Sequence, residues 1–399
     1  MVIVDRRQRL AILSEAAGLD RDARLRSPAR VGNQVGIAGV RLPGGGSTTL
    51  MRIMQTNACS LSCGYCPTFC GGKVKRATLS PEEAATTFME AHRKGLVDGL
   101  FLTSGVPGRA ERATDRMLAT LEILRRRESF RGYLHVKLLP GAQEAQVEAA
   151  ARLADRISVN LEAPTDAHVR ALAREKDLSG DLLPKLELAG RLLRERSGGA
   201  GTTTQFVVGA AGERDREILG VVAGLERRRL LHHAHFSAFQ PVVGTPMEGR
   251  PSTPAARELR LYQAEHLLRQ YGFTWEELPF ASDGNLPLDD DPKTAWAIAH
   301  PERFPIEIET ASYAQLVRVP GLGPAAARTL VAERHQTLMR GARDLERAGV
   351  DVVRAGYFLS LRGRRLAASL PPRQLRLFAP GQHLTQAAWK TTTPPCAYR

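Results

Sequence analysis

Four of the five cysteines of this chain lie in one short segment, where Cys59, Cys63 and Cys66 form a C-x3-C-x2-C array just past a predicted strand. Three thiolates on one loop can bind three of the four irons of a 4Fe-4S cubane. The fourth iron then has no protein ligand and stays open to a small molecule. The spacing therefore predicts a cluster with one open coordination position.

A closed metal site is the alternative. Cys70 lies four residues after Cys66 and would supply the fourth thiolate of a zinc site or a closed cluster. Zinc sites usually pair two C-x2-C knuckles, which favours the open cluster. We therefore expect Cys70 to lie near the site as a bystander, and its role as a hydrogen donor or extra ligand is a separate hypothesis.

Alternating strands and helices are expected to position this loop. Apolar β-branched runs predict six strands, near residues 51–56, 99–105, 133–140, 156–163, 202–210 and 232–242. The first helix has a clear start, because Ser80 can cap it, Pro81 fits its first position and Glu83 completes a capping box. Further helical faces recur near residues 111–128, 141–154, 181–197, 213–230 and 255–271.

This alternation predicts the fold class, α/β. Strands that alternate strictly with helices are parallel and joined by right-handed crossovers. Six such units form an open, partial (β/α)6 barrel rather than a closed eightfold one, and ligands should bind at the carboxyl ends of its strands.

The cysteine motif resembles the signature of the radical S-adenosylmethionine (SAM) superfamily, C-x3-C-x-φ-C, in which φ is aromatic and is Tyr65 here. The resemblance implies a radical SAM barrel that holds a 4Fe-4S cluster and SAM. In such a site SAM chelates the open iron, accepts one electron and releases a 5′-deoxyadenosyl radical. It also implies an electron donor such as flavodoxin or ferredoxin.

The same resemblance implies contacts to SAM at the strand ends. Thr103, Ser104 and Gly105 take the place of the Gly-rich motif for the SAM amino group, although they depart from its usual GGE form. Asn160 and Glu162 resemble residues that bind the ribose and carboxylate. The stretch containing Gly209 and Gly212 resembles the segment beside the adenine, and a tight turn explains these glycines equally well.

Two residues are candidates for a catalytic role. Lys137 lies on the third predicted strand, where a buried charge needs a partner. His135 on the same strand is a weaker candidate for a residue of the site, without a catalytic role assigned to it. Cys70 is the second candidate, through the hydrogen-donor hypothesis.

The charge balance favours a polyanionic partner. The formal net charge is +14, from 56 Lys and Arg against 42 Asp and Glu, and such a surplus favours nucleic acid through counterion release and steering. An Arg-rich proteome is the alternative explanation. No run approaches the roughly 18 apolar residues of a membrane span, and the N-terminus lacks the apolar core of a signal peptide. We therefore expect a cytoplasmic protein with no membrane partner.

Residues 316–324, LVRVPGLGP, resemble a helix-hairpin-helix. Gly321 and Gly323 would expose backbone N–H groups beside a helix N-terminus, which suits one phosphate, and Arg318 and Arg328 would add flanking charge. Such contacts read the DNA backbone rather than its sequence. A plain helical hairpin in protein contacts is the alternative.

The C-terminal tail carries a second partner signal. Residues 374–378, QLRLF, resemble the bacterial sliding-clamp-binding peptide, in which Gln anchors while leucine and phenylalanine fill an apolar pocket. The residues concerned are Gln374, Leu375, Leu377 and Phe378. No acidic residue follows Asp351, so the tail suits a polyanion, and a merely solvated basic tail is the alternative.

These features predict five segments along the chain. They are an N-terminal extension (1–48), the radical SAM core barrel (49–280), a Pro- and Asp-rich linker (281–299), a small all-α helix-hairpin-helix domain for DNA (300–355) and the basic tail (356–399).

Together, the barrel, the hairpin and phrases such as KLLPG (137–141) and TQFVVG (204–209) resemble a bacterial family of radical SAM proteins assigned to DNA modification or repair, over about residues 50–355. The resemblance implies a uracil-DNA-glycosylase-like partner. One alternative is an RNA-modifying radical SAM enzyme. Another is a DNA-binding protein whose cluster is structural or redox-sensing, and SAM cleavage separates it from both enzymes.

Overall fold

The computed structural model describes residues 5–18, 36–41, 47–196, 201–334 and 341–370 of the 399. Backbone contacts divide the chain into two units, residues 1–286 and 287–399, and each unit is described by itself. Among the described helices, none combines the length and the apolar character needed to cross a bilayer.

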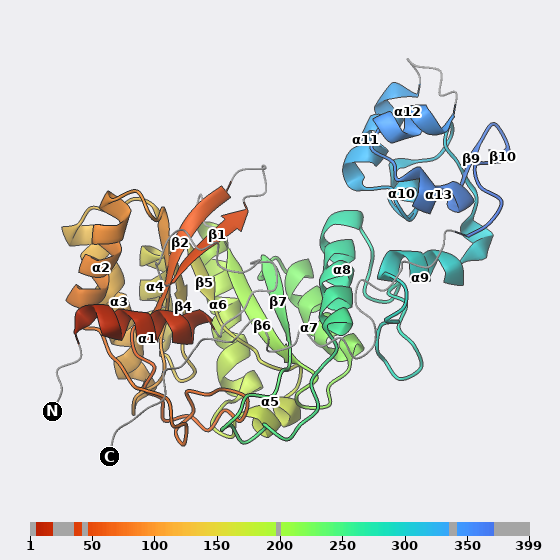
Figure 1. The fold of residues 1–399 in the computed structure, drawn as a ribbon. Coiled ribbons are helices and arrows are strands. Elements are labelled where there is room, and N and C mark those ends of the chain that lie inside the picture. Colours follow the sequence, from red (N-terminus) through yellow and green to blue (C-terminus); the bar gives the residue numbers. More distant parts are fainter. Residues whose placement is uncertain (1–4, 19–35, 42–46, 197–200, 335–340, 371–399) are drawn as a thin grey trace, which may run out of the picture. The chain divides into compact units, whose positions relative to one another are not determined.

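The first unit is built on a seven-stranded sheet whose strands follow the order of the chain (Figure 1). Strands β2 to β7 are parallel, and β1 pairs antiparallel with β2. The six parallel strands curl into the half-barrel predicted from the sequence. The strands are β1 (Ile37–Arg41), β2 (Ser47–Met54), β3 (Gly99–Thr103), β4 (Tyr133–Lys137), β5 (Arg156–Ser158), β6 (Thr202–Val208) and β7 (His233–Ala238).

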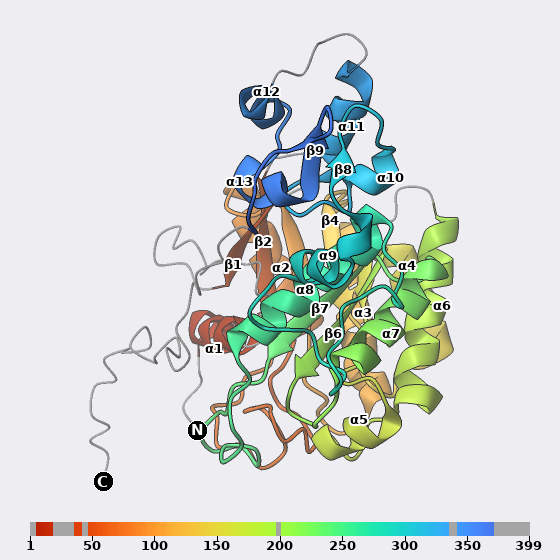
Figure 2. The same cartoon turned by 90° about the vertical axis from the view of Figure 1, so that its right-hand side faces the viewer.

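Helices connect successive parallel strands, and Figure 2 shows α3, α4, α6 and α7 on one side of the sheet. Short π-helical segments extend α3 and precede α6, at Ile123–Arg127 and Leu178–Leu182. The helices are α1 (Arg6–Gly18), α2 (Pro81–Arg93), α3 (Ala110–Glu122), α4 (Glu144–Leu153), α5 (Asp166–Leu172), α6 (Leu183–Glu195), α7 (Asp215–Arg227) and α8 (Ala255–Tyr271).

The two faces of the sheet differ in chemistry. In β4, Leu134 and Val136 are completely buried, whereas the alternating His135 and Lys137 are only half-buried. Side chains on a strand point alternately to the two faces, so the apolar set packs under the helices and the polar set faces the inside of the half-barrel. The strand register places further polar residues on this inner face: Arg52, Ser158, Thr203, Gln205, His235 and Ser237.

The N-terminal residues that we interpreted as an extension contribute a helix and a strand to the first unit. Arg9 of α1 forms a 2.6 Å ion pair with Glu83 of α2, and Arg6 pairs with Glu90 at 2.9 Å. The predicted start of α2 is confirmed. Ser80 and Glu83 form a reciprocal capping box, with Pro81 at the first helical position.

The second unit is not all-α, and its regular structure continues past residue 355 into the segment that we predicted as a basic tail. It contains a three-stranded sheet, in which β8 (Ile306–Glu307) pairs parallel with β9 (Leu359–Leu361), and β9 pairs antiparallel with β10 (Arg364–Arg365). Strands of two or three residues are too short to show the alternation that identifies a strand. Its helices are α9 (Pro292–Ala299), α10 (Tyr313–Leu316), α11 (Pro324–Glu333), α12 (Ala342–Arg347) and α13 (Val352–Ala355), with 3₁₀ turns at Pro301–Arg303 and Gly356–Phe358.

Candidate functional site

The cysteine segment is a loop that follows β2 at the carboxyl ends of the parallel strands. It lies against the loop after β3, where Ser60 N–H donates to the Val106 carbonyl at 2.8 Å and Val106 N–H lies 3.5 Å from Cys59 Sγ. Gly105 permits this approach, because a Cβ there would lie 2.3 Å from the Ala58 carbonyl oxygen. The predicted site residue Gly105 therefore shapes the cysteine loop directly.

One arginine ties the cysteine loop together. Arg76 donates to the backbone carbonyls of Asn57 at 2.6 Å, Thr68 at 2.9 Å, Phe69 at 2.8 Å and Gly72 at 3.0 Å. These four carbonyls lie on both sides of the cysteine array. Nothing in the sequence marked Arg76, because its partners are backbone atoms that only the folded loop brings together.

The three cysteines of the motif are more enclosed than Cys70. Cys63 is buried, Cys59 and Cys66 are half-buried, and Cys70 is exposed. Burial raises the pKa of the Cys63 thiol to about 11, and the positive charge of Lys176 opposes this shift. Burial also raises the pKa of Cys66, whose sulfur lies 3.1 Å from Thr68 Oγ1. A bare thiolate is therefore unfavourable here unless a metal or another cation stabilises it.

This arrangement fits an iron-sulfur cluster. The thiols of Cys59, Cys63 and Cys66 lie near enough to influence one another electrostatically. Within the described residues, no three His, Cys, Asp or Glu side chains converge closely enough to hold a single metal ion. A cubane requires a wider arrangement, because each thiolate binds a different iron.

A buried ion pair lies beside the thiols. Lys176 Nζ is 2.7 Å from Glu162 Oε1 and 3.4 Å from the Tyr65 hydroxyl, and both charged residues are buried. Burial alone would lower the pKa of Lys176, but the negative charges of Cys63 and Glu162 outweigh it and raise that pKa. The structure thus brings together two predicted residues, Tyr65 and Glu162, with a lysine that sequence reasoning missed.

Glu162 is held in an uncommon backbone conformation. Its φ is +65°, in the left-handed region that non-glycine residues rarely adopt. Its backbone is fixed to β6, because its N–H donates to the Gln205 carbonyl at 2.9 Å and its carbonyl accepts from Val207 N–H at 2.8 Å. Such conformations cost free energy and cluster at functional sites.

Asn160 and Lys137 meet on the inner face of the sheet. Both donate to Gln205 Oε1, Asn160 from Nδ2 at 3.4 Å and Lys137 from Nζ at 3.5 Å. Gln205 in turn donates to Ser237 Oγ at 2.9 Å. These contacts join the catalytic candidate Lys137 to the predicted cofactor residue Asn160 through a residue that we did not predict.

The remaining residues predicted to contact SAM lie at strand ends, and the hydrogen bonds they form in the structure stabilise the local loops and turns. The carbonyl of Thr103 accepts from Gln55 N–H at 2.7 Å, and Ser104 Oγ donates to the Gly105 carbonyl at 2.7 Å. Gly209 and Gly212 have φ values of +86° and +81°. They form a tight turn whose N–H groups at residues 209 and 211 donate to the buried Glu213 carboxylate.

In the second unit, the predicted phosphate site lies between α10 and α11. Gly323 is the N-cap residue of α11, and Gly321 has a φ of +78°. The Gly321 carbonyl accepts from Asp351 N–H at 2.9 Å, and a Cβ at Gly321 would lie 2.7 Å from the Asp351 carbonyl oxygen. Arg328 is exposed on α11. The hairpin therefore packs against the segment that begins α13.

Of the other residues predicted to bind partners in the C-terminal region, Arg318 is described by the structure and the clamp-binding motif is not. The Arg318 guanidinium carbon lies 5.6 Å from the centre of the Trp296 ring, so this arginine takes part in the packing of the second unit. Gln374, Leu375, Leu377 and Phe378 lie outside the described residues.

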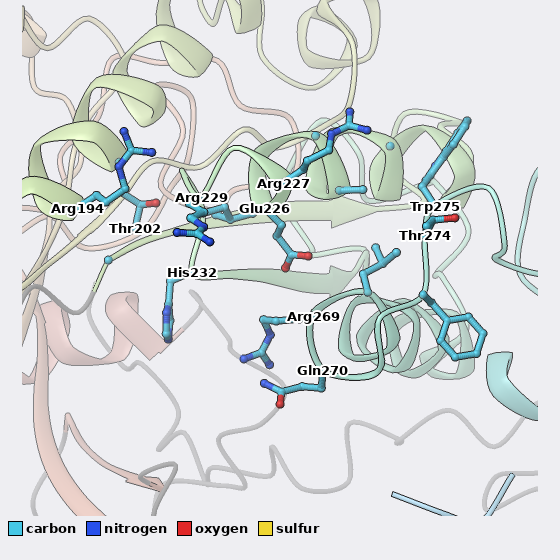
Figure 3. Close-up of a pocket in the computed structure, with 18 of the residues that line it drawn as sticks. Arg194, Thr202, Glu226, Arg227, Arg229, His232, Arg269, Gln270, Thr274 and Trp275 are labelled. Carbon is cyan, nitrogen blue, oxygen red and sulfur yellow. The ribbon is translucent and has the colours of Figure 1, made fainter. Parts of the chain in front are cut away.

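A large cavity lies apart from the cysteines, at the amino ends of β6 and β7 (Figure 3). Its volume is about 1030 Å³, and no cysteine lines it. Four arginines surround it, and Glu226 points toward Arg269 of α8. Burial and the nearby Glu265 raise the pKa of Glu226 to about 8, against the opposing effect of Arg269. The arginines are Arg194, Arg227, Arg229 and Arg269.

The comparison with protein families agrees with the motif. Residues 53–223 match the model of the radical SAM superfamily. Similar solved structures include methylornithine synthase (PylB), with 16% identity and a TM-score of 0.44, and the [FeFe]-hydrogenase maturase HydG from Carboxydothermus hydrogenoformans, with 16% identity and a TM-score of 0.45. Each similarity covers 54% of this chain, which spans 60% and 50% of those two chains. No curated protein matches the sequence.

Proposed function

Since residues 53–223 form a radical SAM domain whose cofactors are a 4Fe-4S cluster and SAM, we propose that this chain is an enzyme that modifies or repairs DNA. When bound, these cofactors supply a 5′-deoxyadenosyl radical that abstracts hydrogen from a substrate. Cys59, Cys63 and Cys66 would hold the cluster. Cys70 is exposed and lies outside this set.

The residues around the thiols would order the site. Arg76 fixes the backbone of the cysteine loop, and the ion pair of Glu162 and Lys176 borders it with Tyr65. Because both members of this pair are buried, they keep their geometry without competition from water. Asn160, together with the strand-end residues 103–105, would contact SAM, as the family resemblance implies.

The hairpin of the second unit carries the DNA part of the proposal. Among the described residues, no acceptor pairs with the backbone N–H groups of Gly321 and Gly323, which lie at the start of α11. Such N–H groups beside a helix N-terminus can bind a phosphate, and the exposed Arg328 adds positive charge nearby. The net charge of +14 supports a polyanionic partner. A base that reacts inside the barrel would have to leave the helical stack.

The decisive experiment measures SAM cleavage with different nucleic acids. Anaerobically reconstituted and reduced protein is expected to release 5′-deoxyadenosine, and duplex or single-stranded DNA should increase the rate at least severalfold over RNA. A Cys63→Ala variant should abolish release, whereas Cys70→Ala should retain it. A larger increase with RNA would indicate that RNA, not DNA, is the substrate. If reduced, iron-loaded protein released no 5′-deoxyadenosine at all, a structural or redox-sensing cluster would be favoured.

A binding experiment tests the hairpin separately. Arg328→Glu is expected to weaken binding to a duplex of random sequence about tenfold while leaving SAM cleavage without DNA unchanged. Arg112→Glu is the matched control, because Arg112 is an exposed arginine of the first unit. An equal loss of duplex affinity in the two variants would show that DNA binding depends on the overall charge of the protein rather than on the hairpin.

The tail motif supports a further partner of the same enzyme. We propose that residues 374–378 bind a sliding clamp, which would hold the enzyme on DNA, and that a uracil-DNA-glycosylase-like protein acts with it. A double variant, Leu377→Ala with Phe378→Ala, should lose clamp binding in a pull-down with purified clamp. Unchanged affinity of this variant would remove the clamp from the proposal.

A further inference from the structure

The inner face of the half-barrel carries a connected row of polar side chains close to the cysteine loop. Lys137 is the last residue of β4, Asn160 follows β5, and Gln205 and Ser237 lie on β6 and β7. Parallel barrels usually fill this space with branched apolar residues. Here apolar residues such as Leu134 and Val136 face the helices, and the inner face combines Phe101 and Val207 with a polar surface where a substrate would meet the cofactors.

Gln205 is the centre of this row. Its Oε1 accepts from Lys137 and Asn160, and its Nε2 donates to Ser237 at 2.9 Å. These contacts fix the orientation of the amide, since a flipped amide would place its NH₂ group against two donors. Gln205 also carries the carbonyl that binds Glu162 N–H, so the row is joined through the backbone to the ion pair beside Cys63.

Cations gather on the same face. The Arg52 guanidinium carbon lies 5.3 Å from the centre of the Phe101 ring, and Lys137 Nζ lies 5.8 Å from that centre. His135 contacts the Phe101 ring edge-on, with ring centres 4.6 Å apart. Burial lowers the pKa of His135, and so do Arg156, His235, Lys137 and Arg52, all of which are basic residues. The field at this face therefore attracts an anion.

We infer that this inner face binds the phosphate of a nucleotide through Lys137, and that Gln205 positions the lysine for that contact. The inference rests on the proposed function and adds to it the chemical group by which the barrel recognises its substrate. A phosphate matches the cations of the face, and the hydroxyl group of Ser237 can hydrogen-bond to sugar or base.

Mononucleotides separate this inference from the hairpin. The affinity of the full-length, cluster-loaded protein would be measured for thymidine 5′-monophosphate and for thymidine, by equilibrium dialysis under anaerobic conditions. The monophosphate is expected to bind at least tenfold more tightly than the nucleoside. In Lys137→Met this preference should fall below twofold, while Lys137→Arg should keep most of it. Gln205→Leu should reduce it severalfold, because the lysine loses its positioning contact.

The control variants identify which idea fails. Lys94→Met removes an exposed lysine of the same unit and should leave the preference unchanged. Arg328→Glu should weaken duplex binding and leave mononucleotide binding unchanged. Lys137→Met should weaken mononucleotide binding and leave duplex binding by the hairpin unchanged. Equal affinity for thymidine and its monophosphate, or an unchanged preference in Lys137→Met, would overturn the inference. Failure of DNA to bind or to increase SAM cleavage would overturn the proposed function instead.

Discussion

At the scale of single residues, the cysteine loop depends on a side chain outside the cysteine motif. Arg76 satisfies four carbonyls of the loop, and these acceptors span residues 57 to 72. A guanidinium is suited to this task because its five N–H groups lie in one rigid plane and point in different directions. Lysine would offer fewer donors from a single point and would not replace it.

Removal of this guanidinium should loosen the loop and weaken cluster binding. We expect Arg76→Ala to retain less than half of the iron and visible absorbance of the unsubstituted protein after identical reconstitution and desalting. Lys73→Ala is the matched control, because Lys73 is an exposed cation of the same loop. Equal iron content in both variants would show that the loop keeps its shape without Arg76.

Glu226 should give the first unit a measurable pH dependence. Its pKa is about 8 in the folded protein against an ordinary value of 4.5, because it is buried near Glu265, and its Oε1 has no hydrogen-bond partner among the described residues. The unfolded chain releases this proton at lower pH than the folded chain does. Folding stability should therefore fall as pH rises from about 4.5 to about 8.

An isosteric substitution tests this assignment. Glu226→Gln cannot ionise, so it should raise the free energy of unfolding at pH 8 by about 1–3 kcal/mol and reduce the difference between pH 5 and pH 8. Urea unfolding at the two pH values measures the effect. The control is Glu276→Gln, since Glu276 is exposed at the same cavity and its pKa is lowered rather than raised. A parallel shift in both variants would contradict the assignment.

Residue types and spacing predicted only part of the candidate site. Cys59, Cys63, Cys66 and Tyr65 belong to one local motif, so their spacing carries the signal. Lys176 and Gln205 act through partners far away in the chain, and no periodic pattern links such residues. Only the folded chain brings Lys176 beside Glu162 and Tyr65, and Gln205 beside Lys137 and Asn160.

At the scale of elements, the hairpin of the second unit depends on the backbone of Gly321. This residue combines a left-handed φ with close contact to Asp351. A side chain there would be strained by both the backbone conformation and the contact. Gly349 has a similar φ of +87°, but a Cβ there would meet only the Ala326 side chain at 3.7 Å.

This pair of glycines provides a matched comparison. Gly321→Ala is expected to destabilise the second unit by about 1–3 kcal/mol, and Gly349→Ala should cost less because only the backbone conformation opposes it. Thermal unfolding of the full-length variants, followed by amide hydrogen exchange in the second unit, measures both effects. Equal destabilisation would show that the contact between Gly321 and Asp351 contributes nothing.

The strands of the half-barrel were predictable because each of the six is followed by a long helical pattern. Elements that lack such a pattern were missed. Strand β1 precedes the alternation, α5 has only seven residues, and β8 to β10 have two or three residues each. Their formation depends on pairing with distant segments, which local sequence does not encode.

At the scale of the whole molecule, the chain joins a radical SAM domain to a second unit that carries the proposed DNA contact. If phosphates supply most of the affinity, binding should weaken steeply as salt rises. The logarithm of the affinity for a duplex should fall linearly with the logarithm of salt concentration. Arg328→Gln should reduce that slope by about 1, whereas Arg112→Gln should leave it unchanged. A slope that does not depend on salt would contradict backbone recognition.

The hydrogen bonds of Arg76 to the cysteine loop bear on how the protein responds to oxygen. Oxygen destroys exposed iron-sulfur clusters, and a loop organised only by its metal would collapse when the iron leaves. Here the guanidinium of Arg76 adds four hydrogen bonds to the loop, none of which involves the metal. We therefore expect a cluster lost to oxidation to be rebuilt from fresh iron and sulfide without refolding of the chain.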